Sequence, residues 1–223
     1  MPELHSLLLF IAAGLLLNLT PGPDVLYIVT RALRSGSRAG IVAGLGITAG
    51  CFVHITAAAV GVSALMAAST TLFAVLKWMG AAYLLWVGVR MLLSRPSKNE
   101  PAPATAGTDP AGPASMKSVF LGGFWTNVLN PKVALFFLAF VPQFIAPEAA
   151  NKPLVFFLLG ALFNFNGIFV NLAWAMLAGW TARRVGAVQR GMHWLERGAG
   201  ALFVGFGIKL ALSENPLAAH PAH

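Results

Sequence analysis

The sequence contains few charged residues. Asp, Glu, Lys and Arg make up 10% of its 223 positions, whereas 57% are hydrophobic and the mean hydropathy is +0.75. A soluble core of this size cannot hold so many apolar side chains. Several nearly uncharged stretches of about twenty residues could each cross a hydrocarbon layer roughly 30 Å thick. These runs are too long and continuous for the short alternating strands of a β-barrel, so we predict transmembrane helices in a lipid bilayer.

Other absences exclude several functional classes. The single cysteine, Cys51, rules out an intrachain disulfide and a Cys-X-X-Cys redox centre, and we interpret it as a small packing residue. The first ten residues contain no Lys or Arg, so they lack the basic start of a cleaved signal peptide. The sequence contains no nucleotide-binding loop of the Gly-x-x-x-x-Gly-Lys-Ser/Thr type. The five histidines are scattered, and we expect no catalytic residues, no metal and no cofactor.

The formal net charge is +8, but the Lys and Arg residues flank the predicted helices and form no patch interleaved with aromatic residues. We therefore expect no nucleic-acid partner. Lys and Arg in short loops of membrane proteins stay on the cytoplasmic side. Here they concentrate in the first, third and fifth loops, so six crossings would place both termini outside.

Six apolar segments are long enough to count as candidate spans, although the last is short and five crossings is the alternative. They are residues 4–30, 40–67, 72–93, 118–145, 153–178 and 198–212. We predict an all-α polytopic membrane protein with six transmembrane helices, arranged as two inverted three-helix repeats with a broken first helix in each half. The predicted units are a first repeat at 1–93, a flexible cytoplasmic linker at 94–117, a second repeat at 118–213 and a short tail at 214–223.

A polar insert interrupts the first segment of each predicted half, and both inserts have the order Leu, capping residue, Pro. They read Asn18-Leu19-Thr20-Pro21-Gly22-Pro23-Asp24 and Asn127-Val128-Leu129-Asn130-Pro131-Lys132. Pro-interrupted segments at corresponding positions of inverted halves indicate the central site of a transporter. A membrane tolerates the freed backbone groups only against protein or an aqueous cavity. A structural proline kink is the alternative for either insert.

Each insert also predicts the start of a second half-helix. Thr20 or Asn130 would be the N-cap, and Pro21 or Pro131 the first helical residue. Such N-termini would direct partial positive charge and unpaired N–H groups to the interior, which suits a carboxylate.

The inserts carry opposite charges, on Asp24 and Lys132. Asp24 is also explained as a favourable first-turn residue, whereas Lys132 gains nothing from the dipole of its own helix. Charges within spanning segments are costly, and the two residues are each other's most obvious partners.

Three further polar residues lie inside predicted spans. His54 could relay a proton or act as a hydrogen-bonded packing residue. Asn164 and Asn171 share one helix face and either line the pathway or hydrogen-bond between helices. Gly36, Gly40 and Gly44 are spaced by four residues, as are Gly46 and Gly50, and this spacing predicts close helix packing, within the chain or in a homo-oligomer.

Two stretches resemble signatures of the LysE/RhtB family of amino-acid exporters. The second insert carries one of them, Asn127 with Asn130-Pro131-Lys132. The other is the run from Asn18 to Asp24 followed by Arg31, Gly36, Arg38, Gly40, Gly44 and Gly50. The similarity covers nearly the whole chain and is specific for the family, not for the substrate. It implies a bacterial inner-membrane secondary exporter of amino acids or close derivatives, driven by the proton gradient. The wider superfamily includes thiol-disulfide electron carriers, a branch that the lone Cys51 excludes.

We expect a zwitterionic amino acid to lie between the two breaks, its ammonium near Asp24 and its carboxylate near Lys132 and the half-helix N-termini. The competing local interpretation is a structural ion pair between these residues. At the level of function, the alternative is a channel or facilitator for small polar solutes. The candidates for proton coupling are Asp24 and His54, and those for substrate binding are Asn18, Thr20, Pro21, Gly22, Pro23, Asp24, Asn127, Asn130, Pro131, Lys132, Asn164 and Asn171.

Overall fold

The structure, a computed structural model, describes residues 4–68, 70–93, 115–146, 149–181, 197–198, 200–201, 204–205, 207–209 and 211–212. Most of the predicted linker 94–117, parts of the sixth segment and the tail 214–223 lie outside these residues. The division into two repeats and a linker therefore stays a prediction.

The described elements are all helical, as predicted. In chain order they are α1 (Leu4–Leu19), α2 (Pro23–Ser35), α3 (Ser37–Ala68), α4 (Thr70–Leu93), α5 (Met116–Val128), α6 (Pro131–Leu135), a π-helical segment (Phe136–Phe140), a 3-10 segment (Val141–Phe144) and α7 (Lys152–Thr181).

Two helices and two bent pairs are candidate membrane spans among the described residues. The stretches Ser37–Gly61 of α3 and Lys152–Trp180 of α7 are long and apolar enough to cross a membrane. The axis bends by 49° between α1 and α2, and by 45° between α5 and the segment Pro131–Phe144. Counting each bent pair as one span gives up to four. The predicted breaks within the segments 4–30 and 118–145 are confirmed.

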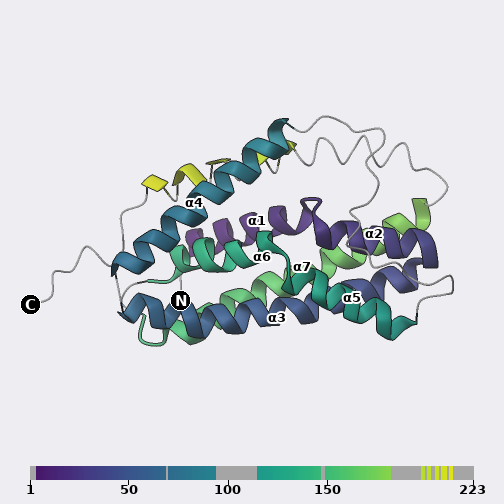
Figure 1. Ribbon diagram of the computed structural model, residues 1–223, viewed down its shortest axis with the longest axis horizontal. Helices are drawn as coiled ribbons and strands as arrows, with labels where there is room; N and C mark the ends of the chain where they lie inside the picture. Colours follow the sequence, from purple (N-terminus) through teal and green to yellow (C-terminus); the bar gives the residue numbers. More distant parts are fainter. Residues whose placement is uncertain are drawn as a thin grey trace, which may run out of the picture.

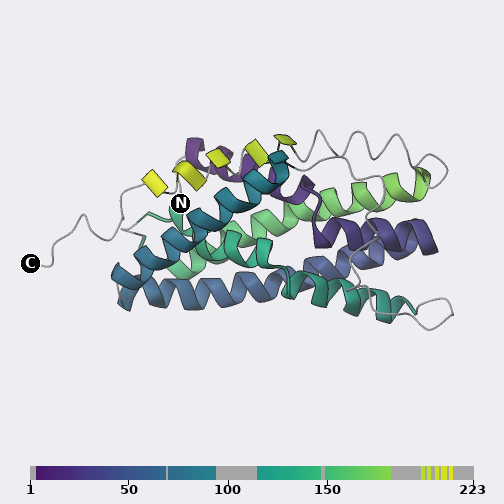
Figure 2. The same ribbon diagram turned by 45° about the horizontal axis from the view of Figure 1, so that its top comes forward.

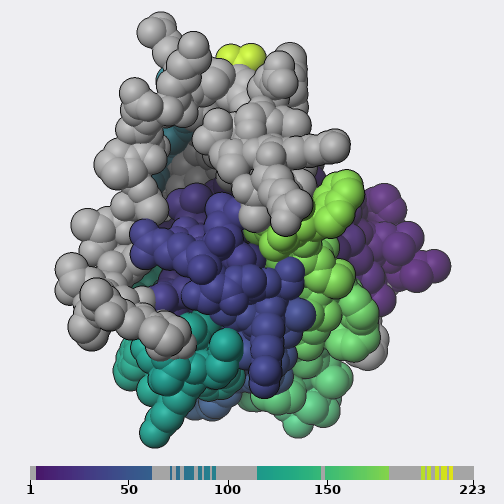
Figure 3. Space-filling model, turned by 90° about the vertical axis from the view of Figure 1, so that its right-hand side faces the viewer, coloured from purple at the N-terminus to yellow at the C-terminus, as the bar shows by residue number. Residues whose placement is uncertain are grey.

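The two bent pairs run in opposite directions, with α1 and α6 toward one end of the molecule and α2 and α5 toward the other (Figure 1). Helix α3 contacts α2 of the first pair, α5 of the second and α7. Figure 3 views the molecule from the α2 and α5 end, where α5 lies on one side of α3 and α7 on the other. Helix α4 diverges from this bundle, and the described pieces from 197 to 212 lie beside it (Figure 2).

Glycines on α3 permit its close contacts. A Cβ at Gly50 would come 2.5 Å from the carbonyl oxygen of Phe124, and one at Gly46 would overlap the carbonyl of Phe120. On another face, a Cβ at Gly40 would lie 3.0 Å from the Cβ of Ala175. The predicted role of these glycines in close packing within the chain is confirmed.

Aromatic side chains fill the space beside the second break. Phe136 of the π-helical segment packs on Phe163 of α7, with ring centroids 4.7 Å apart, and Phe10 of α1 packs on Phe144 at 5.3 Å. These contacts form an apolar core between α1, α7 and the Phe136–Phe144 segment.

Candidate functional site

The first break separates α1 from α2 at residues 20–22. The prediction that Thr20 is an N-cap is wrong, because its hydroxyl donates a hydrogen bond to the carbonyl of Leu16 and so closes α1. Gly22 is the N-cap residue, in an extended conformation with no side-chain cap, and Pro23 rather than Pro21 begins α2. Both prolines suit a first helical position, and the helix begins at the second.

The second break follows the predicted pattern. Asn130 is the N-cap of α6, and its Oδ1 accepts a hydrogen bond of 3.0 Å from the main-chain N–H of Lys132. Pro131 occupies the first turn. Because the Asn130 side chain is only 2% exposed, this cap holds the break inside the protein.

Lys132, at the second break, reaches the first break. Its Nζ donates hydrogen bonds of 3.1 Å to the carbonyl oxygens of Leu17 and Thr20. These carbonyls belong to the end of α1, where backbone oxygens lack helical partners and the helix dipole is negative. Gly22 leaves room for this ammonium, since a Cβ there would lie 3.1 Å from it. Lys132 thus compensates the C-terminus of α1.

Asp24, in turn, is bound by a residue of the second bent pair. The Nδ2 of Asn127, near the end of α5, donates a hydrogen bond of 2.9 Å to its Oδ2. Asp24 and Lys132 interact electrostatically, as predicted, but no salt bridge joins them within the described part of the chain, where each has other hydrogen-bond partners. Each charge instead lies at the helix end whose dipole favours it.

His54 of α3 is connected to this network. Its Nε2 donates a hydrogen bond of 2.9 Å to the main-chain oxygen of Asn127, since a carbonyl can only accept. Its ring is parallel to that of Phe137, with centroids 6.4 Å apart. His54 is thus hydrogen-bonded and packed, and Asn127 links it to Asp24.

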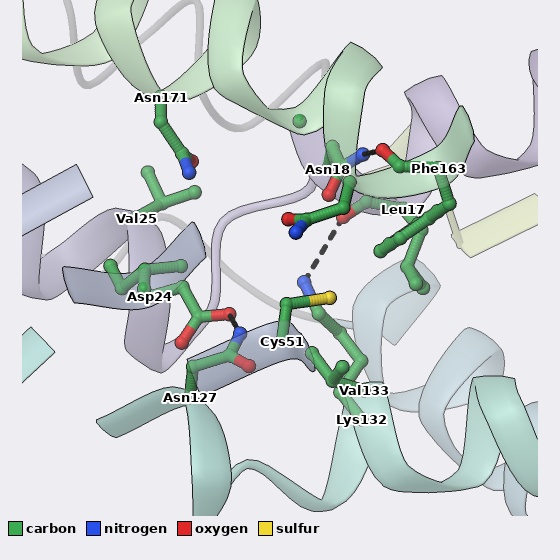
Figure 4. A pocket seen from close by; sticks show the side chains of 13 residues that line it. Leu17, Asn18, Asp24, Val25, Cys51, Asn127, Lys132, Val133, Phe163 and Asn171 are labelled. Atoms are coloured by element: carbon green, nitrogen blue, oxygen red, sulfur yellow. Dashed lines mark hydrogen bonds between the residues drawn. The ribbon is translucent and has the colours of Figure 1, made fainter. Parts of the chain in front are cut away.

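The breaks border a small cavity of about 20 Å³, room for little more than a water (Figure 4). Asp24 and Lys132 approach it from different sides. Its lining residues are Leu17, Asn18, Asp24, Val25, Ile47, Cys51, Asn127, Lys132, Val133, Phe163, Asn164, Gly167 and Asn171.

Three buried polar atoms beside these breaks have no hydrogen-bond partner: Asp24 Oδ1, Asn127 Oδ1 and Asn130 Nδ2. Two of the three are acceptors on residues that line the cavity. Buried polar atoms are normally paired, so the free acceptors leave a place for a donor.

The cavity brings together six of the predicted site residues: Asn18, Asp24, Asn127, Lys132, Asn164 and Asn171. The others, Thr20, Pro21, Gly22, Pro23, Asn130, Pro131 and His54, shape or flank the breaks and do not line it.

Sequence reasoning did not predict the other seven lining residues, and two of them, Cys51 and Gly167, lie near predicted residues on their helices. Cys51, interpreted as a packing residue, is buried but lines the cavity, and Gly167 lies between the two predicted asparagines of α7. The sequence signal for these two residues was their helical spacing from residues that had been predicted as part of the site. Cys51 precedes His54 by three positions, and Gly167 follows Asn164 by three.

Comparison with known proteins gives a consistent family match. Residues 15–214 match the family described as LysE type translocator. An uncharacterized membrane protein of Pseudomonas aeruginosa is 35% identical over 86% of this chain and 88% of its own. A leucine efflux protein of Enterobacter sp. is 30% identical over 91% and 93%, and a homoserine/homoserine lactone efflux protein of Salmonella typhimurium is 29% identical over 92% and 96%. No solved structure matches this chain.

Proposed function

Because this chain belongs to the LysE type translocator family, we propose that it is a secondary exporter of amino acids or close derivatives in a bacterial inner membrane, coupled to protons. Members of this family are transporters, so the protein is not an enzyme. The names of two relatives, leucine efflux protein and homoserine/homoserine lactone efflux protein, support a small amino-acid substrate.

The observation that carries this proposal is the cavity between two broken helices with opposite charges in its wall. A zwitterionic amino acid carries an ammonium and a carboxylate on neighbouring atoms. The opposite directions of the two bent pairs support two inverted halves, which in transporters meet at the substrate site. With six crossings and the cationic loops inside, both termini face outward.

The ammonium of the substrate would bind the free acceptors Asp24 Oδ1 and Asn127 Oδ1. Its carboxylate would bind Lys132, whose ammonium has three N–H donors and uses two of them on α1. These groups recognise only what all α-amino acids share. The small cavity means that binding requires the halves to move apart, which the breaks and the glycine contacts permit.

Asp24 is the proposed proton-coupling residue, because it is the only Asp or Glu in the described part of the chain and lies in the cavity wall. In the outward-facing state a proton would compete with the substrate ammonium for its carboxylate. Proton binding there would release the amino acid, and the carrier would return inward with the proton in its place.

The experiment uses inverted membrane vesicles, in which an acidic interior should drive uptake of labelled leucine or homoserine. Asp24→Asn should abolish the stimulation of uptake by the pH gradient, whereas Glu214→Gln, in the predicted tail, should leave it intact. An Asp24→Asn protein that transports with unchanged pH dependence would exclude this coupling role. Flux without counter-movement of protons in the wild type would indicate a facilitator.

A further inference from the structure

We propose that Asn171 of α7 determines substrate specificity, and that the preferred substrate is an amino acid whose short, uncharged side chain carries a hydroxyl or amide group. This rests on the proposed function and concerns the part of the cavity that the two charges do not occupy. Asp24 and Lys132 bind groups common to all amino acids, so selection must come from the remaining wall.

Helix α7 supplies a polar strip to that wall. Asn164, Gly167 and Asn171 are spaced by three and four residues, which puts them on one helix face, and all three line the cavity. In Figure 4 the side-chain amide of Asn171 points from α7 toward the cavity, near Val25. Gly44 of α3 packs against Asn171, since a Cβ at Gly44 would lie 3.1 Å from the Asn171 Cβ.

The asparagines of this wall differ in their hydrogen bonds. Asn164 Nδ2 donates to the carbonyl of Thr48 at 3.1 Å and so joins α7 to α3. Asn18 Nδ2 lies 3.5 Å from the carbonyl of Phe163. Asn171, although half-buried, has no hydrogen-bond partner among the described residues. Its amide therefore offers both a donor and an acceptor to the cavity, a combination that a hydroxyl or an amide can satisfy.

The charge and the shape of the wall further restrict which substrate side chains can bind. Among the described residues, Asp24 is the only acidic one that lines the cavity, and it is needed for the substrate ammonium, so a cationic side chain would have no counter-ion. The wall is also narrow on the α7 side, because a Cβ at Gly167 would come 3.3 Å from the Asn18 amide. A side chain of one or two carbons with a terminal polar group suits such a wall better than a long or branched apolar one.

The test compares homoserine with norvaline, which has nearly the same shape but ends in a methyl in place of the hydroxyl. Competition for labelled homoserine uptake into inverted vesicles gives the preference of each variant. The wild type should prefer homoserine. Asn171→Leu should reduce the homoserine-to-norvaline preference roughly tenfold, about the effect of one lost buried hydrogen bond. Asn171→Gln, which keeps the amide, should retain part of the preference.

Asn166→Leu is the matched control, because Asn166 lies on the same helix but does not line the cavity, and it should leave the preference unchanged. A wild type that transports norvaline or leucine better than homoserine overturns the specificity proposal and leaves the export function intact. An unchanged preference in Asn171→Leu overturns it equally. If no amino acid is transported, both proposals fail. The comparison of homoserine with norvaline in the wild type needs no variant. It therefore tests the specificity proposal even if Asn171→Leu does not accumulate in the membrane.

Discussion

Replacing Lys132 by methionine should separate a functional charge from a structural one. Methionine keeps an unbranched side chain of similar length and removes the ammonium. Export should be lost, because the wall of the cavity then has no cation to bind the substrate carboxylate. The fold, by contrast, should change little in stability.

The expected stability follows from two opposing effects. The ammonium donates two hydrogen bonds of 3.1 Å to α1, and charge-assisted bonds of this kind contribute ~1.5–3 kcal/mol each, or about 3–6 kcal/mol together. Removing the charge also removes the desolvation penalty of a buried ion, which is several kcal/mol. We therefore expect the free energy of unfolding to change by no more than about 2 kcal/mol. At roughly 2–4 °C per kcal/mol for a chain of this length, the Tm should stay within about 8 °C.

The assay pairs uptake into inverted vesicles with thermal unfolding of the purified protein in one detergent. Lys117→Met is the control, because Lys117 is exposed at the start of the same bent pair and should retain both export and Tm. Retained export in Lys132→Met would refute the role in substrate binding. A fall in Tm well beyond about 10 °C would instead assign Lys132 to holding the two halves together.

Three further predictions concern the same breaks. Gly50→Leu should lower the Tm sharply, because its side chain would collide with the main chain of α5, whereas Gly61→Ala, with nothing within 4 Å, should not. Asn127→Leu should reduce export at least about tenfold, because the carboxylate of α2 loses its hydrogen-bond donor, and Thr126→Val should not, because that hydroxyl bonds only within α5. His54→Gln keeps a donor for the α5 carbonyl, so export and its pH dependence should persist; a lost pH response with retained transport would make this histidine the coupling group.

The sequence was sufficient to predict the helical class of the described residues and the position of both breaks. Long apolar runs identify helices, and each proline next to a capping residue marks a break. Asn130 was predicted as a cap, and it is one, because a short polar side chain before a proline has few other uses inside a membrane. The four-residue glycine interval also identified a packing face of α3, since the spacing itself defines the face.

The partners of the charges were not predictable in the same way. A charged side chain inside a membrane was expected to pair with the opposite charge. The carbonyls at the end of α1 were a competing partner that no side-chain pattern indicates. The prediction of Thr20 as an N-cap was wrong for a related reason, because its hydroxyl donates to a carbonyl in the preceding turn of α1. The helix pattern also did not reveal the π-helical segment Phe136–Phe140.

Most cross-helix hydrogen bonds at this site join a side chain to a backbone carbonyl. Besides those of Lys132, they include Tyr27 to Val119, His54 to Asn127 and Asn164 to Thr48. A main-chain acceptor is supplied by any amino acid, so mutations at the accepting position leave the contact in place. In a collection of homologous sequences, the donors would stay fixed while their acceptors drift. Correlated substitutions between contacting positions would therefore reveal few of these contacts. The exception is the pair formed by Asp24 and Asn127, whose hydrogen bond joins two side chains.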